Sequence, residues 1–185
     1  MRSAFDEVYI SVDVETAGPD PGQYSLLSIG ASLVFDPAKT FYVELQPVNG
    51  AFTSEALQIS GLALEKLKAE GQPPGEAMRQ FSDWVSQTIP AGSHPIFVGL
   101  NAAFDWMFVA TYFHRHLGRN PFGHNALDIK AYYMGMTGTQ WHASGFEEMI
   151  KHYHIEQALT HNALQDALAQ GLIFRRMLEE QKGAA

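Results

Sequence analysis

The chain begins with a segment in which apolar and polar side chains alternate, and this two-residue period predicts a β-strand. In residues 8–15 every second side chain is valine or isoleucine, and the residues between them are Tyr9, Ser11, Asp13 and Glu15. The alternation therefore places two carboxylates on a strand whose other side is apolar.

Two more strands are expected in the next part of the chain. Residues 26–35 (LLSIGASLVF) and 40–45 (TFYVEL) are rich in apolar and aromatic side chains, and residues 36–39 (DPAK) have the length and composition of a hairpin turn. We therefore expect the chain to open with three antiparallel strands.

After these strands the apolar residues follow helical spacing, with two short strands among the helices. In the helix expected at 102–118, for example, Phe104, Met107, Phe108 and Thr111 share one face. The other expected helices are two short ones within 53–71, broken at Ser60-Gly61, and 73–89, 130–136, 145–154 and 163–181, and the expected strands are 94–100 and 125–129. This order indicates an α/β layered fold with a mixed sheet.

Length and composition limit the class of protein. The 185 residues suggest one domain covering 1–185. Hydrophobic residues make up 46% of the chain and charged residues 17%, which indicates a compact globular core. The formal net charge of -8 argues against a passive nucleic-acid binder, because phosphate neutralisation normally requires a basic surface. A polyanion would have to be met locally or through metal cations.

Residue usage also bears on the compartment. The absence of cysteine excludes disulfides and thiolate chemistry. The chain shows no signal-peptide h-region and no apolar run of membrane-spanning length, so we expect a cytoplasmic location and no membrane partner.

The paired acids of the first strand are the first candidate for chemistry. Asp13 and Glu15 stand two residues apart, so their side chains project to the same side of the strand. Two desolvated carboxylates repel each other unless a cation lies between them. Oxygen-only ligands of this kind suit Mg²⁺ or Mn²⁺. The alternative is a strand end with solvated carboxylates.

Two further acids follow in helix-start settings. Asp105 lies in the first turn of an apolar helix, and Asp166 lies in the first turn of the last helix, for which Asn162 is the expected N-cap. His161 then stands on the loop before the cap, from where it can face the same pocket as Asp166. The alternative for both acids is simple compensation of the helix dipole.

Taken together, these segments resemble a known family. VDVETAG at 12–18, NAAFD at 101–105 and H-x4-D at 161–166 occur in the order and spacing of the three motifs of the DEDDh 3′–5′ exonucleases, which include the proofreading subunit of bacterial DNA polymerase III and ribonuclease T. The position four residues before the last Asp is Asn162, where the tyrosine variant of the superfamily carries Tyr, so the histidine variant fits.

The resemblance implies a fold and a mechanism. The fold would be ribonuclease-H-like, with a five-stranded mixed sheet flanked by helices. Asp13 would bridge two Mg²⁺ or Mn²⁺ ions, Glu15 and Asp166 would complete the ligands of the first, and Asp105 would support the second. His161 would act as the general base that takes a proton from the attacking water. The products would be nucleoside 5′-monophosphates.

The resemblance also implies contacts to the terminal nucleotide of a single-stranded 3′ end. They would come from the backbone after the first motif, from a loop with an apolar-His-Gly triplet, and from the second motif. The corresponding residues are Thr16 and Ala17, Ile59, Ser60 and Gly61, and Asn101 and Phe104. Ser60 stands where the family commonly has histidine, which separates this chain from the usual pattern.

Two other functions stay open at this point. One is a non-catalytic nucleic-acid-binding module on the same fold, and the other is a metal-dependent phosphatase. The choice between DNA and RNA is also open, as is association with a second copy or with a polymerase.

Overall fold

The computed structural model describes residues 6–183 of the chain. Five strands form one mixed sheet in the order β3-β2-β1-β4-β5. The strands are β1 (Glu7–Thr16), β2 (Leu26–Leu33), β3 (Asp36–Glu44), β4 (His94–Gly99) and β5 (Ala126–Asp128). The first three pair antiparallel, whereas β4 pairs parallel with β1 and β5 parallel with β4.

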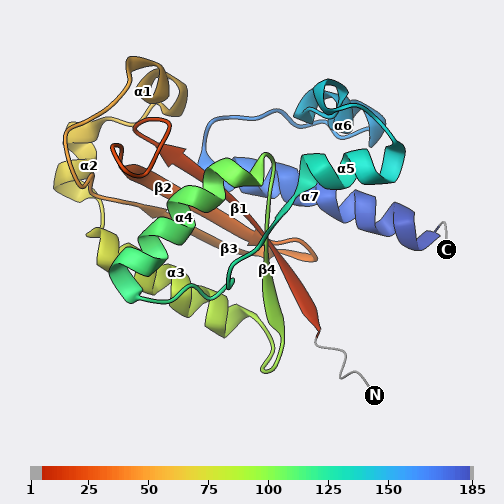
Figure 1. The fold of residues 1–185 in the computed structure, drawn as a ribbon, viewed down its shortest axis with the longest axis horizontal. Helices are drawn as coiled ribbons and strands as arrows, with labels where there is room; N and C mark the ends of the chain where they lie inside the picture. Colours follow the sequence, from red (N-terminus) through yellow and green to blue (C-terminus); the bar gives the residue numbers. More distant parts are fainter. Residues whose placement is uncertain (1–5, 184–185) are drawn as a thin grey trace.

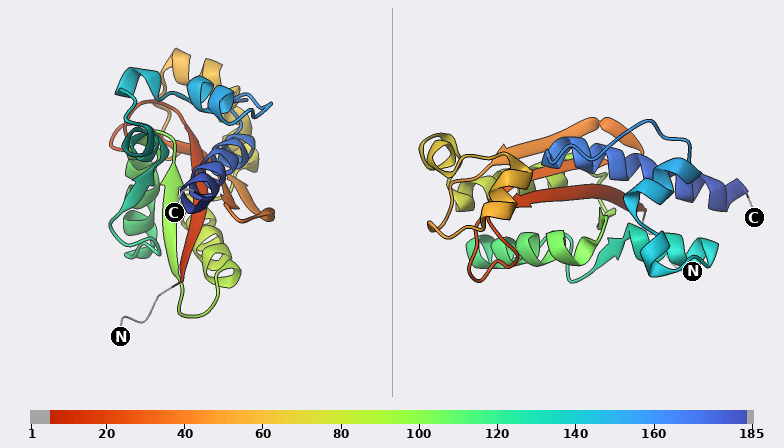
Figure 2. Two further views of the ribbon diagram at one scale, coloured as in Figure 1. Left: turned by 90° about the vertical axis from the view of Figure 1, so that its right-hand side faces the viewer. Right: turned by 90° about the horizontal axis from the view of Figure 1, so that it is seen from above.

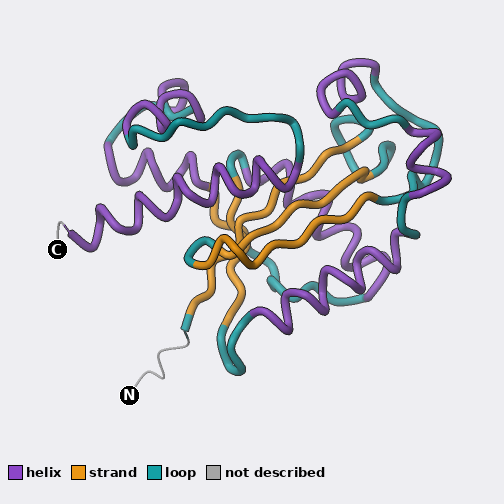
Figure 3. Tube along the Cα trace, turned by 180° about the vertical axis from the view of Figure 1, so that it is seen from behind, coloured by secondary structure: helices purple, strands orange, loops and turns teal. Residues whose placement is uncertain are grey.

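Helices cover both faces of this sheet (Figures 1 and 3). They are α1 (Ser54–Ser60), α2 (Leu64–Glu70), α3 (Pro74–Thr88), α4 (Ala102–Leu117), α5 (Ile129–Thr137), the short 3-10 helix η1 (Trp141–Ala143), α6 (Phe146–His152) and α7 (Ala163–Gly183). The predicted five-stranded α/β fold is confirmed. The prediction that residues 1–185 form one domain stays a prediction.

The alternation in β1 divides the core into two layers. Ile10, Val12 and Val14 are buried against α3 and α4, whereas Tyr9 packs on the cluster formed with α5, α6 and α7. Seen from above, α4 lies along one side of β1 and α7 along the other (Figure 2, right). Asp13, being in phase with Tyr9, belongs to the side of the sheet on which α7 lies.

The hairpin between β2 and β3 differs from the prediction. The expected turn at 36–39 is wrong, because the chain already reverses at Val34 and Phe35, and Leu33 pairs with Asp36. The amide of Val34 donates to the carbonyl oxygen of Tyr9 at 3.0 Å, which holds the turn against β1. Residues 37–39 then form a bulge on β3, which is an edge strand. Pro37 has no backbone N–H, but at this position it removes no hydrogen bond from the interior of the sheet.

The face of α4 that carries the four apolar-spaced residues is only partly buried. Of the residues predicted to share one face, Phe108 is fully buried, whereas Phe104 is 38% exposed and Met107 and Thr111 are half-buried. The buried residues of this helix are Ala102, Asp105, Phe108, Val109, Tyr112 and Phe113. The inner face therefore includes the carboxylate of Asp105, and Phe104 is turned toward the surface.

Small residues let α7 lie close to the sheet. A Cβ atom at Gly30 would overlap the carbonyl group of Ala163 and the amide nitrogen of Leu164, in the first turn of α7. Gly30 is the cross-strand partner of Asp13. Because no side chain stands at Gly30, the first turn of α7 reaches β1 beside Asp13.

Within residues 6–183, no helix has both the length and the apolar character that crossing a bilayer requires. The cytoplasmic location stays a prediction.

We expect Gly30→Ala to lower the free energy of unfolding by about 1–3 kcal/mol, the usual range for an overpacked site. Its new methyl group forces the first turn of α7 away from the sheet. Thermal unfolding measures the effect. Gly135→Ala in α5 is the matched control, because a Cβ there meets no atom within 4 Å and alanine is the better helix former. Equal melting temperatures for Gly30→Ala and the wild-type protein would contradict this role of Gly30.

Candidate active site

The site lies where β1 and β4 separate. Their parallel pairing runs from Glu7 and His94 to Ser11 and Val98, and β1 then continues to Thr16. Ligand sites of mixed and parallel sheets commonly lie at such carboxyl ends of strands. The residues of all three sequence motifs meet at this opening.

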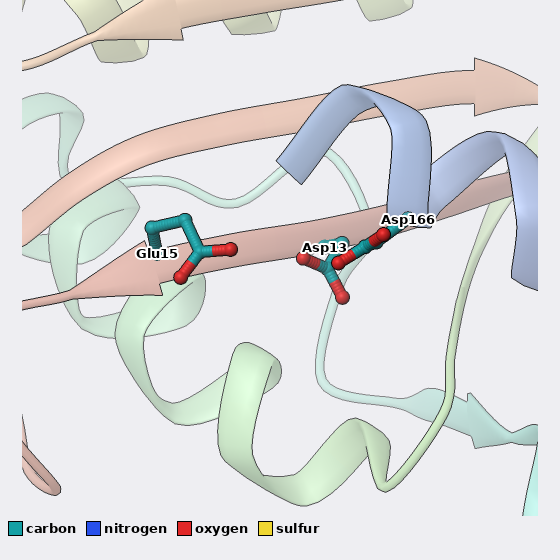
Figure 4. Close-up of side chains that lie close together, drawn as sticks. All are labelled: Asp13, Glu15 and Asp166. Carbon is teal, nitrogen blue, oxygen red and sulfur yellow. The ribbon is translucent and has the colours of Figure 1, made fainter. Parts of the chain in front are cut away.

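Three carboxylates converge here (Figure 4). Asp13 and Glu15 project from β1 and Asp166 from the first turn of α7, and one oxygen atom of each lies within 4.8 Å of the others. The predicted convergence of Asp13, Glu15 and Asp166 is thus present in the structure. Glu15 and Asp166 are buried, whereas Asp13 keeps some solvent exposure.

Asp105 approaches the same opening from α4. Its Oδ1 accepts a hydrogen bond of 3.0 Å from the backbone amide of Val14, between the two acids of β1. This carboxylate therefore ties the first turn of α4 to the strand that carries Asp13 and Glu15. It lines one cavity with them but lies outside the group of three that are closest together.

Asp166 also shapes the loop that carries His161. Its Oδ1 accepts from the backbone amide of Thr160 at 2.7 Å, and its Oδ2 accepts from the amide of His161 at 2.9 Å. Asn162 caps α7, because its Oδ1 accepts from the amide of Gln165 at 3.2 Å. His161 has a φ of 56°, a left-handed conformation that is uncommon outside glycine. The expected placement of the histidine on the loop before the cap is confirmed.

Burial and neighbouring acids raise the pKa values of Asp13, Glu15 and Asp105. Burial, followed by repulsion from Asp105, Glu15 and Asp166, raises the pKa of Asp13 well above its usual value. Burial, with repulsion from Asp166 and Asp105, raises the pKa of Glu15 to about 8. Burial raises the pKa of Asp105 to about 7, although the hydrogen bond from Val14 opposes the shift. Without a cation, the raised pKa of Glu15 favours its protonated form at neutral pH.

The site has the donor set for a hard divalent cation. Its ligands are carboxylate oxygens, which suit Mg²⁺, Mn²⁺ or Ca²⁺. None of the ion pairs formed within residues 6–183 involves these four acids, so no lysine or arginine neutralises them. A cation is therefore the group that these residues fit.

Two cavities adjoin the acids. The first, of about 370 Å³, is lined by the four acids, His161, Asn101, Phe104 and four further residues, namely Val14, Leu100, Leu159 and Gln170. The second, of about 380 Å³, is more apolar and is lined by Thr16, Ile59 and Phe104 beside Val14, Glu15, Gly18, Pro19, Thr53, Glu55 and Ala56. Val14, Glu15 and Phe104 line both, so the cavities are neighbours across these residues.

Of the seven residues expected to touch substrate, four line these cavities. Ile59 is 47% exposed at the end of α1, and Asn101 holds a left-handed φ of 54° where α4 begins. Phe104 stands between the two cavities, and the Thr16 hydroxyl donates to the carbonyl of Gly18.

Three of the expected contact residues do not line either cavity. Ala17 is fully buried, with its amide bonded to Ser25 and its carbonyl to Thr53. Ser60 accepts from the amide of Leu62, and Gly61 ends α1 in a left-handed conformation, with a φ of 66°.

Two residues that the sequence analysis did not single out support the site. Asp128 ends β5 and caps α5, with one oxygen accepting from Ala131 at 2.8 Å and the other accepting from Ala102, the first residue of α4, at 2.6 Å. Asp128 lies near the end of the strand expected at 125–129, two residues before the expected helix, and an acid at such a boundary was the available signal for a cap. Gln170 is buried on α7, one turn beyond Asp166, and lines the cavity of the acids.

Comparison with known proteins agrees with this geometry. A family model described as an exonuclease of the RNase T type matches residues 10–174. The 3'-5' DNA exonuclease Cap18 of Escherichia coli is 44% identical over 178 residues, which cover 95% of this chain and 95% of Cap18.

Solved structures share the fold at low sequence identity. The nuclease domain of 3'hExo, described as a DEDDh family member and bound to rAMP, superposes with a TM-score of 0.77 at 13% identity over 97% of this chain and 95% of that one. Exonuclease I of E. coli, in complex with a dT13 oligonucleotide, has a TM-score of 0.74 at 18% identity over 97% of this chain and 42% of that one. The expected ribonuclease-H-like architecture is confirmed.

We expect the metal-free protein to lose stability as the pH rises from about 4.5 to about 8, owing to Glu15. The unfolded chain releases the Glu15 proton near the ordinary pKa of 4.5, whereas the folded chain keeps it until about 8, so folding takes up a proton across this window. Thermal unfolding in a chelator measures the trend. The Glu15→Gln variant should lose less stability over the same range, and Mn²⁺ at pH 8 should stabilise the wild-type protein. Parallel pH profiles for the two proteins would contradict the expectation.

Proposed function

This chain belongs to the RNase T type exonuclease family, in its DEDDh group, and we propose that it removes nucleotides one at a time from the 3′ end of single-stranded DNA. It is a 3′–5′ exonuclease.

One observation carries the proposal. Asp13, Glu15, Asp105 and Asp166 come from three separate elements and line one cavity with His161. Side chains that repel one another are unfavourable for stability in a buried place, so their convergence is best explained by a cationic ligand. A binding module has no need of all five groups.

Asp13, Glu15 and Asp166 would hold one divalent cation, and Asp13 with Asp105 would hold a second. When bound, a pair of Mg²⁺ or Mn²⁺ ions supplies positive charge to the scissile phosphate and lowers the pKa of the attacking water. Such ions also explain how a chain with a net charge of -8 accepts a polyanion, because they meet the phosphate where lysine and arginine are absent.

His161 would act as the general base. Its backbone amide is fixed by Asp166, and its imidazole borders the cavity of the acids. An imidazole side chain is the commonest general base for reactions near neutral pH. Asp166 would thus have two roles, as a cation ligand and as the group that sets the position of the base.

The second cavity would hold the terminal nucleotide. Ile59 and Phe104 offer exposed apolar surface to a base, and Thr16, the last residue of β1, lines the same cavity. Gly61 would allow the end of α1 to turn closely beside the nucleotide, with Ser60 and Ala17 supporting the loop backbone. Aromatic and aliphatic contacts of this kind do not select one base, which suits an exonuclease that acts on any sequence.

DNA is the proposed substrate because Cap18, at 44% identity over nearly its whole length, is a 3'-5' DNA exonuclease. All five proposed catalytic groups come from a single chain, so the proposal requires neither a second copy nor a polymerase subunit.

We expect purified protein to shorten a 5′-labelled single-stranded DNA stepwise in Mg²⁺ or Mn²⁺ and to release nucleoside 5′-monophosphates. Asp13→Asn should abolish this activity, since it removes the shared ligand charge. Glu148→Gln on the surface of α6 is the matched control and should leave the rate unchanged. Faster shortening of the RNA of the same sequence would redirect the proposal to RNA, and turnover of a phosphomonoester alone would replace it with a phosphatase.

We expect His161→Ala to lower kcat by roughly 10²–10⁴-fold, the usual contribution of a general base, while single-stranded DNA still binds. His154→Ala is the matched control, because His154 is also an exposed histidine with a left-handed φ, of 51°, but does not line the cavity. Single-turnover rates and a binding measurement in Ca²⁺ separate the two effects. Similar rates for the two variants would remove His161 from the mechanism.

A further inference from the structure

The side-chain amide of Gln170 stands where the ladder between β1 and β4 would otherwise continue. The last pair of this parallel ladder is Ser11 and Val98, so the next pair in register would be Val12 and Gly99. In a parallel ladder the carbonyl of one residue accepts from the amide one position beyond its partner. The next bond would therefore join the carbonyl of Val12 to the amide of Leu100.

The side chain of Gln170 satisfies both the acceptor and the donor of this missing bond. Its Nε2 donates to the carbonyl oxygen of Val12 at 3.0 Å, and its Oε1 accepts from the amide of Leu100 at 2.6 Å. The donor and acceptor positions fix the orientation of the amide, because Val12 offers only an acceptor and Leu100 only a donor here. The side chain is 1% exposed. The amide therefore occupies the place of one ladder bond between the two strands.

This insertion is next to the acids. Val12 directly precedes Asp13 on β1. Val14 directly follows it, and the amide of Val14 donates to Asp105. The backbone around Asp13 is thus held by Gln170 before it and by Asp105 after it. Leu100 precedes Asn101, from which α4 carries Asp105 into the site. The amide therefore spans the two backbone segments from which Asp13 and Asp105 project.

The helix that supplies this amide also supplies an acid. Gln170 follows Asp166 by four residues on α7, so the two side chains leave the same face of the helix. A single rigid element thus fixes Asp166 against β1 and sets the opening between β1 and β4. Without the amide, Val12 and Leu100 can bond directly and close the ladder by one more step.

We propose that Gln170 is a positioning residue, which holds β1 and β4 apart so that Asp13 and Asp105 keep the separation needed to bind divalent cations. The proposal rests on the proposed function for its consequence in catalysis, but its effect on cation binding can be measured without turnover. The contrary possibility is that Gln170 is a satisfied buried amide whose only effect is on stability.

The test compares Gln170→Met with Ile173→Ala. Methionine has nearly the shape of glutamine but neither donates to Val12 nor accepts from Leu100 as an amide does. Ile173 is buried on the same helix and contacts the α5–α7 cluster rather than the opening, so its truncation destabilises the protein without freeing the strands. Melting temperatures, Mn²⁺ affinity by calorimetric titration, and kcat and KM on single-stranded DNA are measured for both variants at a temperature where both are folded.

We expect Gln170→Met to weaken Mn²⁺ binding and to lower kcat, each by roughly 10–100-fold, as is typical for residues that orient metal ligands. KM should stay near the wild-type value. Ile173→Ala should lower the melting temperature but keep Mn²⁺ affinity and kcat. Wild-type Mn²⁺ affinity in Gln170→Met, or an equal loss of affinity in Ile173→Ala, overturns the proposal. If the wild-type protein shortens no oligonucleotide, the proposed function fails, and the Mn²⁺ titration alone still decides the role of Gln170.

Discussion

Repulsion among carboxylates removed from water is the constraint on which the site depends. Asp13, Glu15 and Asp105 all have raised pKa values, and in each case burial is the first cause and neighbouring acids contribute. A fold gains no stability from such a group of side chains, so other contacts must hold them together. The positions of the helices around the opening between β1 and β4 follow from that requirement.

The scaffold meets the requirement with backbone contacts rather than with counter-charges. Gly30 leaves room for the first turn of α7 beside Asp13, and Asp105 binds the amide of Val14. Asp128 joins the starts of α4 and α5, and Gln170 bridges β1 and the residue after β4. These contacts involve backbone atoms, and they fix the segments that carry the acids around one cavity.

Much of this arrangement could be predicted from local sequence, because it depends on short patterns. The period of β1 predicted that Asp13 and Glu15 share a side, and the cap at Asn162 predicted that His161 lies outside α7. These features depend on neighbours along the chain, and all of them are found in the structure.

The features that local sequence did not predict depend on tertiary contacts. The turn after β2 lies at Val34 and Phe35, where the amide of Val34 donates to the carbonyl oxygen of Tyr9 on β1. Asp105 lies on the inner face of α4, where its carboxylate accepts from the amide of Val14. Gln170 carries no local signal, since a glutamine on a helix is ordinarily exposed and only the ladder register reveals its role.

Anomalous diffraction from crystals soaked in Mn²⁺ measures directly whether the converging acids bind a divalent cation. We expect a manganese peak enclosed by the carboxylates of Asp13, Glu15 and Asp166. Manganese bound elsewhere, with none at this place, would mean that the acids converge for another reason.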